Sequence, residues 1–341
     1  MTQARRQIID LSETSFYHCV SRCVRRAFLY GEDRYTHKSF NHRKQWLVDR
    51  FKDLSSIFSI NIAAYAVMSN HYHLVLHVDT TKAATWSDKE VSSRWSQLYH
   101  TTALVDRWLN NESLTNAELD AVSERLALWR ERLMDISWFM RCLNEYIARK
   151  ANKEDNCKGR FWEGRFKSQA LMDEPALLAC MMYVDLNPIR AGMNGDLSSS
   201  EFTSIAERIT CYKQGLKQTD KPKQSDIPAQ PSCLMSFFAN TAETNPVGSI
   251  SYALYDYFEL CDWTGRAIRK DKKGAISTTQ AKLLTELGLT PDDWLKTFNR
   301  FTHHYGSIIG HWQTLSDYKD RFNQHWVKGS TAAHDLYKPL H

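Results

Sequence analysis

The stretch Tyr65-Ala-Val-Met-Ser-Asn-His-Tyr-His-Leu-Val-Leu-His-Val78 decides the fold of this chain. Apolar and β-branched residues flank a Ser69-Asn70 pair, which is typical of a tight turn between two strands. The sequence therefore predicts antiparallel strands over residues 61–68 and 71–78. Because alternate residues of a strand point to the same side of a sheet, His71 and His73 would project from one face.

The segments around this hairpin complete a ferredoxin-like unit. Residues 16–22 predict a first strand, and residues 35–58 carry apolar side chains at helical spacing. Beyond the hairpin, residues 137–152 predict another amphipathic helix and residues 161–171 a closing strand. The fold class predicted is therefore α+β, with the order β-α-β-β-α-β.

The remaining segments predict three further regions. A polar, helical insertion occupies residues 79–136, so that the first domain covers residues 1–212. Residues 213–232, rich in Lys, Gln, Pro, Ser and Asp, predict a linker, and residues 233–341 a mostly helical C-terminal domain. That last region contains a basic cluster that either contacts DNA phosphates or is a solvated charged turn: Arg266, Arg269, Lys270, Lys272 and Lys273.

Composition narrows the class of protein. The chain has 341 residues, 43% hydrophobic and 12% aromatic, with a net charge of +5. This balance is that of a globular protein, and the mild positive charge permits a polyanionic partner without requiring one. No apolar run is long enough to span a bilayer, and the start lacks a secretory leader, so we expect no membrane association and a cytoplasmic location. The eight cysteines are scattered, which predicts reduced structural thiols.

The His71-Tyr72-His73 pair suggests one half of a metal site, because imidazole nitrogens bind divalent ions. Exposed or core-satisfied histidines are the structural alternative. The other half is predicted near Pro188, in a helix over residues 174–186 that this proline would end. Tyr183 and Asn187 are four residues apart and would share one helix face, where the asparagine carbonyl could be a third ligand. A packing tyrosine and a C-capping asparagine are the alternatives that remain open.

Basic and aromatic residues alternate at two places in the first domain. A groove for single-stranded nucleic acid combines phosphate contacts with base stacking, and an ordinary edge strand with a solvated face would show the same composition. The residues concerned are Arg22, Arg25, Arg26, Arg160, Phe161, Trp162, Arg165, Phe166 and Lys167.

Three motifs together resemble a known family. His71-Tyr72-His73, Gly159-Arg-Phe-Trp-Glu-Gly-Arg-Phe-Lys-Ser168 and Tyr183-Val-Asp-Leu-Asn-Pro-Ile-Arg-Ala191 are similar to the motifs of REP-associated tyrosine transposases, within the single-tyrosine HUH superfamily. The resemblance covers roughly residues 10–212. The segment 79–136 and the C-terminal part depart from the short members of that family, which leaves target choice and oligomeric state (monomer or dimer) open.

The resemblance implies a set of roles. His71, His73 and Asn187 would hold Mg²⁺ or Mn²⁺, and Tyr183 would be the nucleophile that cleaves and rejoins single-stranded or hairpin DNA through a phosphotyrosine intermediate. DNA contacts are expected from Arg22, Arg25, Arg26, Arg160, Trp162, Arg165, Lys167 and Arg190.

Two other functions and two other candidate residues compete with this interpretation. A catalytically silent descendant would bind palindromic repeats without cutting, and a metal-dependent hydrolase of small phosphoesters would use water as its nucleophile. Tyr146 is the rival nucleophile, but Lys150 four residues later would repel a metal ion. His77 shares the strand face of His71 and could contact DNA or help to position a phosphate.

Overall fold

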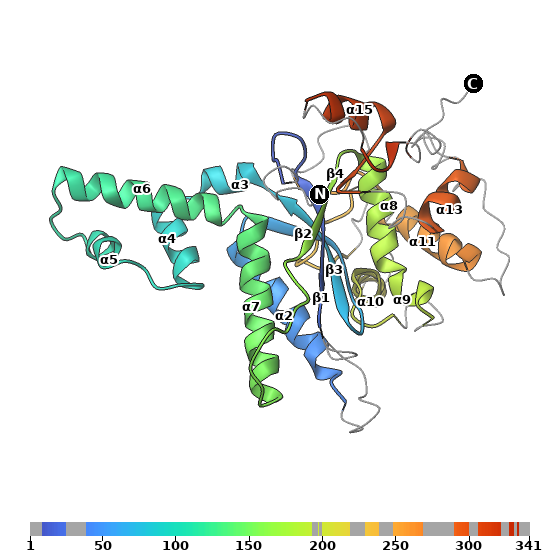
Figure 1. Cartoon of the computed structure of the whole chain (residues 1–341), viewed down its shortest axis with the longest axis horizontal. Coiled ribbons are helices and arrows are strands. Elements are labelled where there is room, and N and C mark those ends of the chain that lie inside the picture. The colour runs from blue at the N-terminus through green and yellow to red at the C-terminus, as the bar shows by residue number, and fades with distance from the viewer. Residues whose placement is uncertain are drawn as a thin grey trace.

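The chain folds around a five-stranded sheet with the strand order β2-β3-β1-β4-β5 (Figure 1). The computed structural model describes residues 9–24, 39–192, 197, 200–218, 229–238, 248–268, 290–299, 306–321, 327–330 and 333. The strands are β1 (Phe16–Arg22), β2 (Ile60–Val67), β3 (His71–Val78), β4 (Lys167–Leu171) and β5 (Ile308–Ile309).

The predicted α+β, ferredoxin-like arrangement is confirmed. Strand β1 lies between β3 and β4 and is antiparallel to both, while β2 and β3 form the predicted hairpin. Helices α2 (His42–Ile57) and α7 (Ile136–Glu154) connect these strands and pack against each other. The sequence did not predict β5, which extends the sheet in parallel beside β4.

The closing strand is shorter than predicted. It begins at Lys167 instead of residue 161, and Trp162 forms only an isolated bridge with Cys23. Gly164 interrupts the extended pattern here, since glycine lacks the side chain that favours a regular strand.

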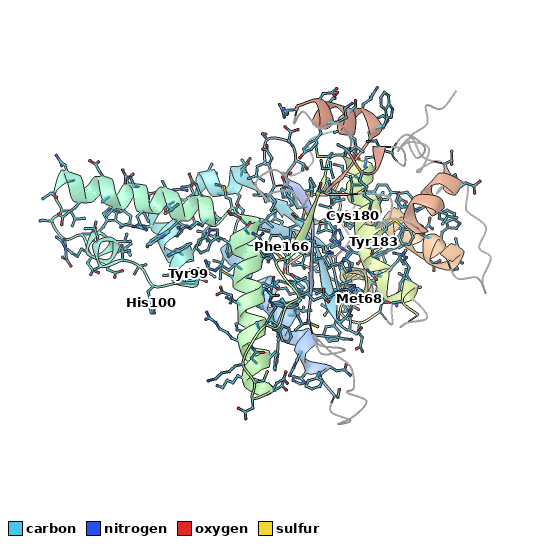
Figure 2. The ribbon with its side chains drawn as sticks, viewed as in Figure 1. Met68, Tyr99, His100, Phe166, Cys180 and Tyr183 are labelled. Carbon is cyan, nitrogen blue, oxygen red and sulfur yellow. The ribbon has the colours of Figure 1, made fainter. Side chains whose placement is uncertain are left out.

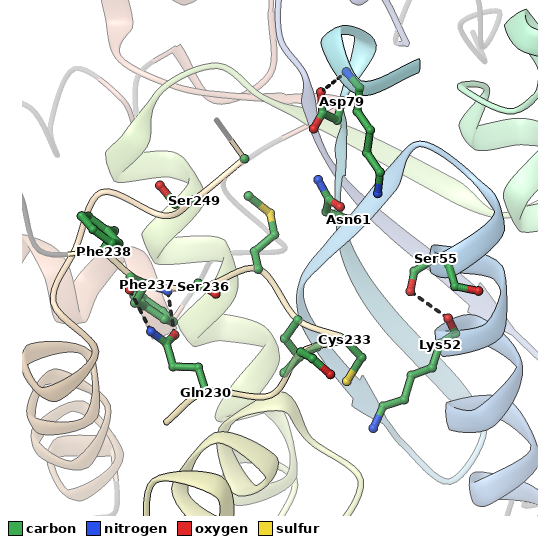
Figure 3. Close-up of a pocket in the computed structure, with 16 residues that line it drawn as sticks. Lys52, Ser55, Asn61, Asp79, Gln230, Cys233, Ser236, Phe237, Phe238 and Ser249 are labelled. Atoms are coloured by element: carbon green, nitrogen blue, oxygen red, sulfur yellow. Dashed lines mark hydrogen bonds between the residues drawn. The ribbon is translucent and has the colours of Figure 1, made fainter. Parts of the chain in front are cut away.

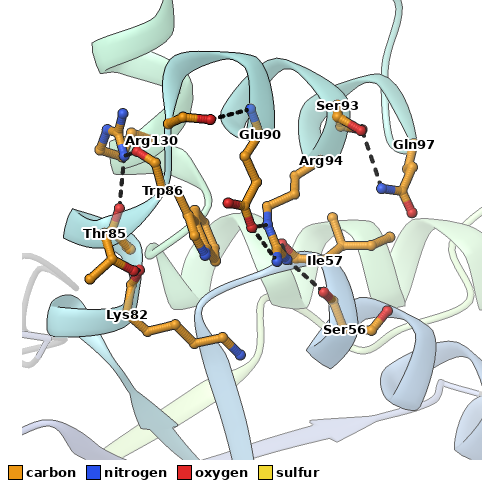
Figure 4. A network of polar contacts seen from close by, with 12 residues as sticks. Ser56, Ile57, Lys82, Thr85, Trp86, Glu90, Ser93, Arg94, Gln97 and Arg130 are labelled. Carbon is orange, nitrogen blue, oxygen red and sulfur yellow. Dashed lines mark hydrogen bonds and ion pairs between the residues drawn. The ribbon is translucent and has the colours of Figure 1, made fainter.

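The insertion forms an arm on one side of the sheet (Figure 1). Its helices begin at capping side chains that accept a backbone N–H, as isolated short helices need. They are α3 (Thr80–Thr85), α4 (Asp88–Ser96), α5 (Ala103–Leu109) and α6 (Asn116–Arg132). Arg94 ties the arm to the end of α2 by donating to the carbonyls of Ser56 and Ile57 at 2.7 and 3.1 Å (Figure 4).

Helices α2 and α7 cover one face of the sheet, and helix α8 (Glu174–Asp185) covers the opposite face, where it contacts β2, β3 and β4. The helix predicted over residues 174–186 is found and ends one residue earlier, before Pro188. The helix ends at Asp185, and Pro188 lies in the first turn of a short helix α9 (Asn187–Arg190), a position that proline tolerates because it needs no N–H donor.

Four later helices contribute residues to the hydrophobic cluster that contains α8. They are α10 (Ser204–Gln218), α11 (Leu254–Ile268), α13 (Pro291–Asn299) and α15 (Trp312–Arg321). Helix α10 continues into the predicted linker, and the Met235 N–H donates to the Ile62 carbonyl of β2 at 2.8 Å. One hydrophobic cluster contains residues of α8 together with Tyr257 and Trp294. The predicted domain boundary therefore does not coincide with a break between hydrophobic cores.

Within the part of the chain described here, no helix combines the length and apolar character needed to cross a membrane.

Candidate functional site

Strand β3 presents its histidines to the face of the sheet that α8 covers. Tyr72 and Leu74 belong to the hydrophobic cluster under α2 and α7, whereas Val75 belongs to the cluster under α8. His71 and His73 alternate with Tyr72 and Leu74, so both lie on the α8 face, with ring centroids 4.9 Å apart. His73 is buried and His71 is half-buried.

Tyr183 and Asn187 lie beside this pair. The Tyr183 ring packs edge-on against His73 at a centroid distance of 5.8 Å, and Asn187 Nδ2 is 3.0 Å from His73 Nε2. Tyr183 comes from the last turn of α8, beside the sheet (Figure 2), while Asn187 opens α9. The structure thus brings together all four residues predicted for the metal and nucleophile, although they do not share one continuous helix.

His18 of β1 is a third histidine at this place, and sequence analysis assigned it no role there. Its Nε2 is 2.9 Å from His73 Nδ1, and its Nδ1 is 2.8 Å from Gln169 Oε1 of β4. The only signal in the sequence was its alternating position in a predicted strand. Recognising its partners requires the register of three strands, because Gln169 is 151 residues away along the chain.

Burial keeps the histidines neutral. Loss of hydration lowers the pKa of His18 and of His71 to about 4, with nearby Arg22 adding to the effect on His71. Burial also lowers the pKa of His73 well below its usual value, and its neighbours His18 and His71 contribute. Neutral imidazole is the form that binds a metal ion.

Three of the expected DNA-binding residues surround the histidines. Arg22 is the register partner of His71, and Lys167 pairs with Val20, which itself pairs with His73. Both basic side chains are exposed. Arg190 of α9 lies with its guanidinium carbon 4.9 Å from the centroid of the Tyr183 ring. This end of the sheet face is therefore positively charged.

Of the other expected DNA contacts, Trp162 lies away from this place. Trp162 is buried and lies on the opposite face, with its ring against Tyr72 at 5.6 Å and its Nε1 donating to the Asn144 carbonyl at 2.9 Å. Arg160 and Arg165 are exposed in the segment before β4. Arg25 and Arg26 lie outside the described residues, as do Arg269, Lys270, Lys272 and Lys273 of the C-terminal cluster.

The two secondary candidates lie apart from the histidine pair. Tyr146 is 38% exposed on α7, the helix that covers the opposite face, and Lys150 Nζ is 3.4 Å from its hydroxyl. His77 is farther along β3, where its Nδ1 is 3.2 Å from Asn61 Nδ2. Cys142, Cys180, Cys211, Cys233 and Cys261 are free thiols.

A buried carboxylate holds the end of α8 in place. Asp185 accepts hydrogen bonds from the Ser204 hydroxyl, from the Ile205 N–H at 2.9 Å and from the Tyr257 hydroxyl at 2.6 Å. Burial raises the pKa of Asp185 to about 6. These contacts connect the helix that carries Tyr183 to α10 and α11.

The distance between His73 Nε2 and the Asn187 amide is compatible with two ligands of one divalent ion. Two ligands at right angles on an octahedral ion, with bonds of ~2.1 Å, are ~3.0 Å apart. His73 Nε2 and the Asn187 amide have this separation, and a rotated amide would present its oxygen there. No group of three or more His, Cys, Asp or Glu side chains in the described ranges is arranged to hold a metal. Two imidazoles and one amide would leave positions for phosphate oxygens and water.

A cavity of about 720 Å³ lies elsewhere, between α2, the start of β2 and residues 230–238 (Figure 3). Lys52, one of its lining residues, pairs with Glu207 at 2.6 Å. None of the predicted metal or nucleophile residues lines this cavity.

No family model matches the sequence, and no curated protein matches it. A solved structure described as a REP-associated tyrosine transposase bound to a REP hairpin is similar with a TM-score of 0.35 and 13% identity, over 70% of this chain and 100% of that chain.

Proposed function

We propose that this protein is a metal-dependent DNA strand transferase that cleaves and rejoins single-stranded DNA, at palindromic hairpins, through Tyr183. The main support for the proposal is that side chains from strand β3, helix α8 and helix α9 lie together. The Tyr183 ring lies 5.8 Å from the His73 ring, and the Asn187 amide lies 3.0 Å from Nε2 of the same histidine. Packing alone does not require a phenol, two imidazoles and an amide in one place.

The chemistry assigned to these residues is a phosphoryl transfer. Tyr183 Oη attacks the phosphorus of a phosphodiester and its phenolic proton passes to solvent. The bond to the departing strand end breaks, and the departing oxygen takes a proton from solvent to become a hydroxyl. A divalent cation held by His71, His73 and Asn187 would offset the charge on the phosphate oxygens. The phosphotyrosine ester retains the bond energy, so the released hydroxyl can attack it in the reverse step.

Arg190 supports Tyr183 in this role. A free phenol has a pKa of about 10 and is a poor nucleophile. The guanidinium, 4.9 Å from the ring centroid, favours negative charge on the phenol oxygen by electrostatic attraction. Arg22 and Lys167, exposed on the same sheet face, are placed to contact phosphates of the bound strand.

Replacement of Lys167 by alanine is expected to weaken hairpin binding at low salt and to reduce the slope of log affinity against log salt by about 1, since one phosphate contact is lost. Lys89→Ala, on the surface of helix α4 in the arm, is the matched control and should leave the slope unchanged. Fluorescence anisotropy of a labelled hairpin, recorded over a series of salt concentrations, measures the affinity of each variant and its salt slope. Equal slopes for the two variants would remove Lys167 from the interface.

The test of the proposed function is incubation of the protein with a hairpin oligonucleotide and Mn²⁺, followed by denaturing electrophoresis. We expect a covalent protein–DNA adduct. A catalytically silent DNA-binding protein is the second candidate, and one observation favours it: both ring nitrogens of His73 already have partners within the chain. That protein would bind the hairpin without an adduct, and a small-phosphoester hydrolase would release product without one.

A further inference from the structure

A chain of hydrogen bonds leads from the C-terminal part of the protein to His73. The Gln169 Nε2 donates to the carbonyl of Gly306 at 2.6 Å. A backbone carbonyl oxygen can only accept, so this contact fixes which end of the Gln169 amide carries the N–H groups. The Gln169 carbonyl, Oε1, is then the atom that lies 2.8 Å from His18 Nδ1.

Each following step is determined by the one before it. An amide oxygen accepts only, so His18 carries its proton on Nδ1 and offers a lone pair at Nε2. Nε2 of His18 is 2.9 Å from Nδ1 of His73, and a lone pair there requires a proton on that nitrogen. In a neutral ring the other nitrogen of His73, Nε2, is left without a proton.

We propose that His18 and Gln169 are positioning residues that fix the tautomer of His73, so that its Nε2 lone pair faces the cation site. The opposite tautomer would point an N–H at the cation and could not bind it. In the orientation that the structure shows, Asn187 Nδ2 donates to this lone pair at 3.0 Å, and a bound cation would take the lone pair and require the amide to rotate. His71 has a similar contact, since Asn70 Oδ1 lies 2.6 Å from its Nδ1 and would accept from a proton on that nitrogen.

Hydrogen-bond acceptors of metal-bound histidines affect metal affinity in many proteins. A metal-bound histidine usually donates its second ring N–H to a neighbouring group, and loss of that neighbour weakens metal binding about 10- to 100-fold. Here the neighbour is another buried imidazole, held by a glutamine whose own anchor, Gly306, follows 137 residues later. The C-terminal part therefore contributes to the site through Gln169. The metal-positioning role rests on the proposed function, whereas the tautomer does not.

The first measurement is a long-range ¹H–¹⁵N NMR spectrum of the full-length, metal-free protein with labelled histidine. We expect His18 and His73 to carry their protons on Nδ1, with assignments taken from the spectra of His18 and His73 variants. A proton on Nε2 of His73 would overturn the proposal. This result does not depend on DNA or on catalysis, so it is distinguishable from failure of the proposed function.

The second measurement uses a matched pair of variants. His18→Gln places an amide oxygen where Nε2 was and can still accept from His73 Nδ1, whereas His18→Leu cannot. The dissociation constant for Mn²⁺, measured by electron paramagnetic resonance, is expected to rise about 10- to 100-fold in His18→Leu and to change less than about 3-fold in His18→Gln.

Equal weakening in both variants would mean that His18 acts only through packing, and no weakening in either would remove it from the site. Either result would overturn the proposal. Thermal unfolding of both variants identifies a folding defect, in which case the NMR tautomer in the wild-type protein decides the question.

Discussion

Tyr183→Phe is expected to lower formation of the covalent protein–DNA adduct by on the order of 10⁴-fold or more, because loss of a nucleophile removes the step that the other groups assist. The ring packs edge-on against His73 and near Phe298, at 5.8 and 6.4 Å, and phenylalanine preserves that packing. Hairpin affinity should therefore stay within about 3-fold, since the phosphate contacts are intact. Denaturing electrophoresis and anisotropy measure the two properties.

Tyr146→Phe is the matched control, because that tyrosine is exposed on α7, away from the histidines. It should form the adduct at the wild-type rate. An adduct that persists in Tyr183→Phe and disappears in Tyr146→Phe would transfer the nucleophile to α7 and refute the assignment.

Asp185→Ala is expected to lower the free energy of unfolding by about 3–5 kcal/mol, since it leaves buried donors without an acceptor. The donors are the Ser204 hydroxyl, the Ile205 N–H and the Tyr257 hydroxyl. Arg208, fully buried and electrostatically coupled to Asp185, would lose its nearby negative charge. Urea denaturation measures the change. Asp53→Ala, on the exposed side of α2, should change the same quantity by less than about 0.5 kcal/mol.

The pH dependence of stability provides a second check on Asp185. Its folded pKa of about 6 lies above the unfolded value of about 3.9, so the folded state binds more protons between them. The contribution of Asp185 to the free energy of unfolding therefore falls as the pH rises through this window. Relative to Asp185→Asn, the wild-type protein should lose stability from about pH 4 to about pH 6. A difference that is constant or grows with pH would contradict the assigned pKa.

Local patterns were sufficient for much of the fold. Alternating apolar residues on both sides of Ser69-Asn70 determine the hairpin, and strands β1 and β3 begin and end where predicted. The helix predicted over residues 137–152 appears as α7, extended to Glu154. Each of these elements is determined by the residues of its own short segment, so a local sequence pattern is enough to predict it.

Long-range pairing was not accessible in this way. Strand β5 has two residues, and its position beside β4 is set by contacts between segments more than a hundred residues apart. The same holds for the His18–Gln169 pair. Trp162 illustrates the opposite error: its spacing among arginines is compatible with base stacking, yet the isolated bridge with Cys23 directs its ring to the α7 face. Composition alone does not distinguish the two faces.

The most direct test of the cation site is anomalous diffraction from crystals of the protein grown with a hairpin oligonucleotide and Mn²⁺. The account predicts one manganese peak within bonding distance of Nε2 of both His71 and His73, with the Tyr183 hydroxyl directed at a phosphate that shares the ion. A peak at another place, or crystals with bound DNA and no manganese near these histidines, would contradict it.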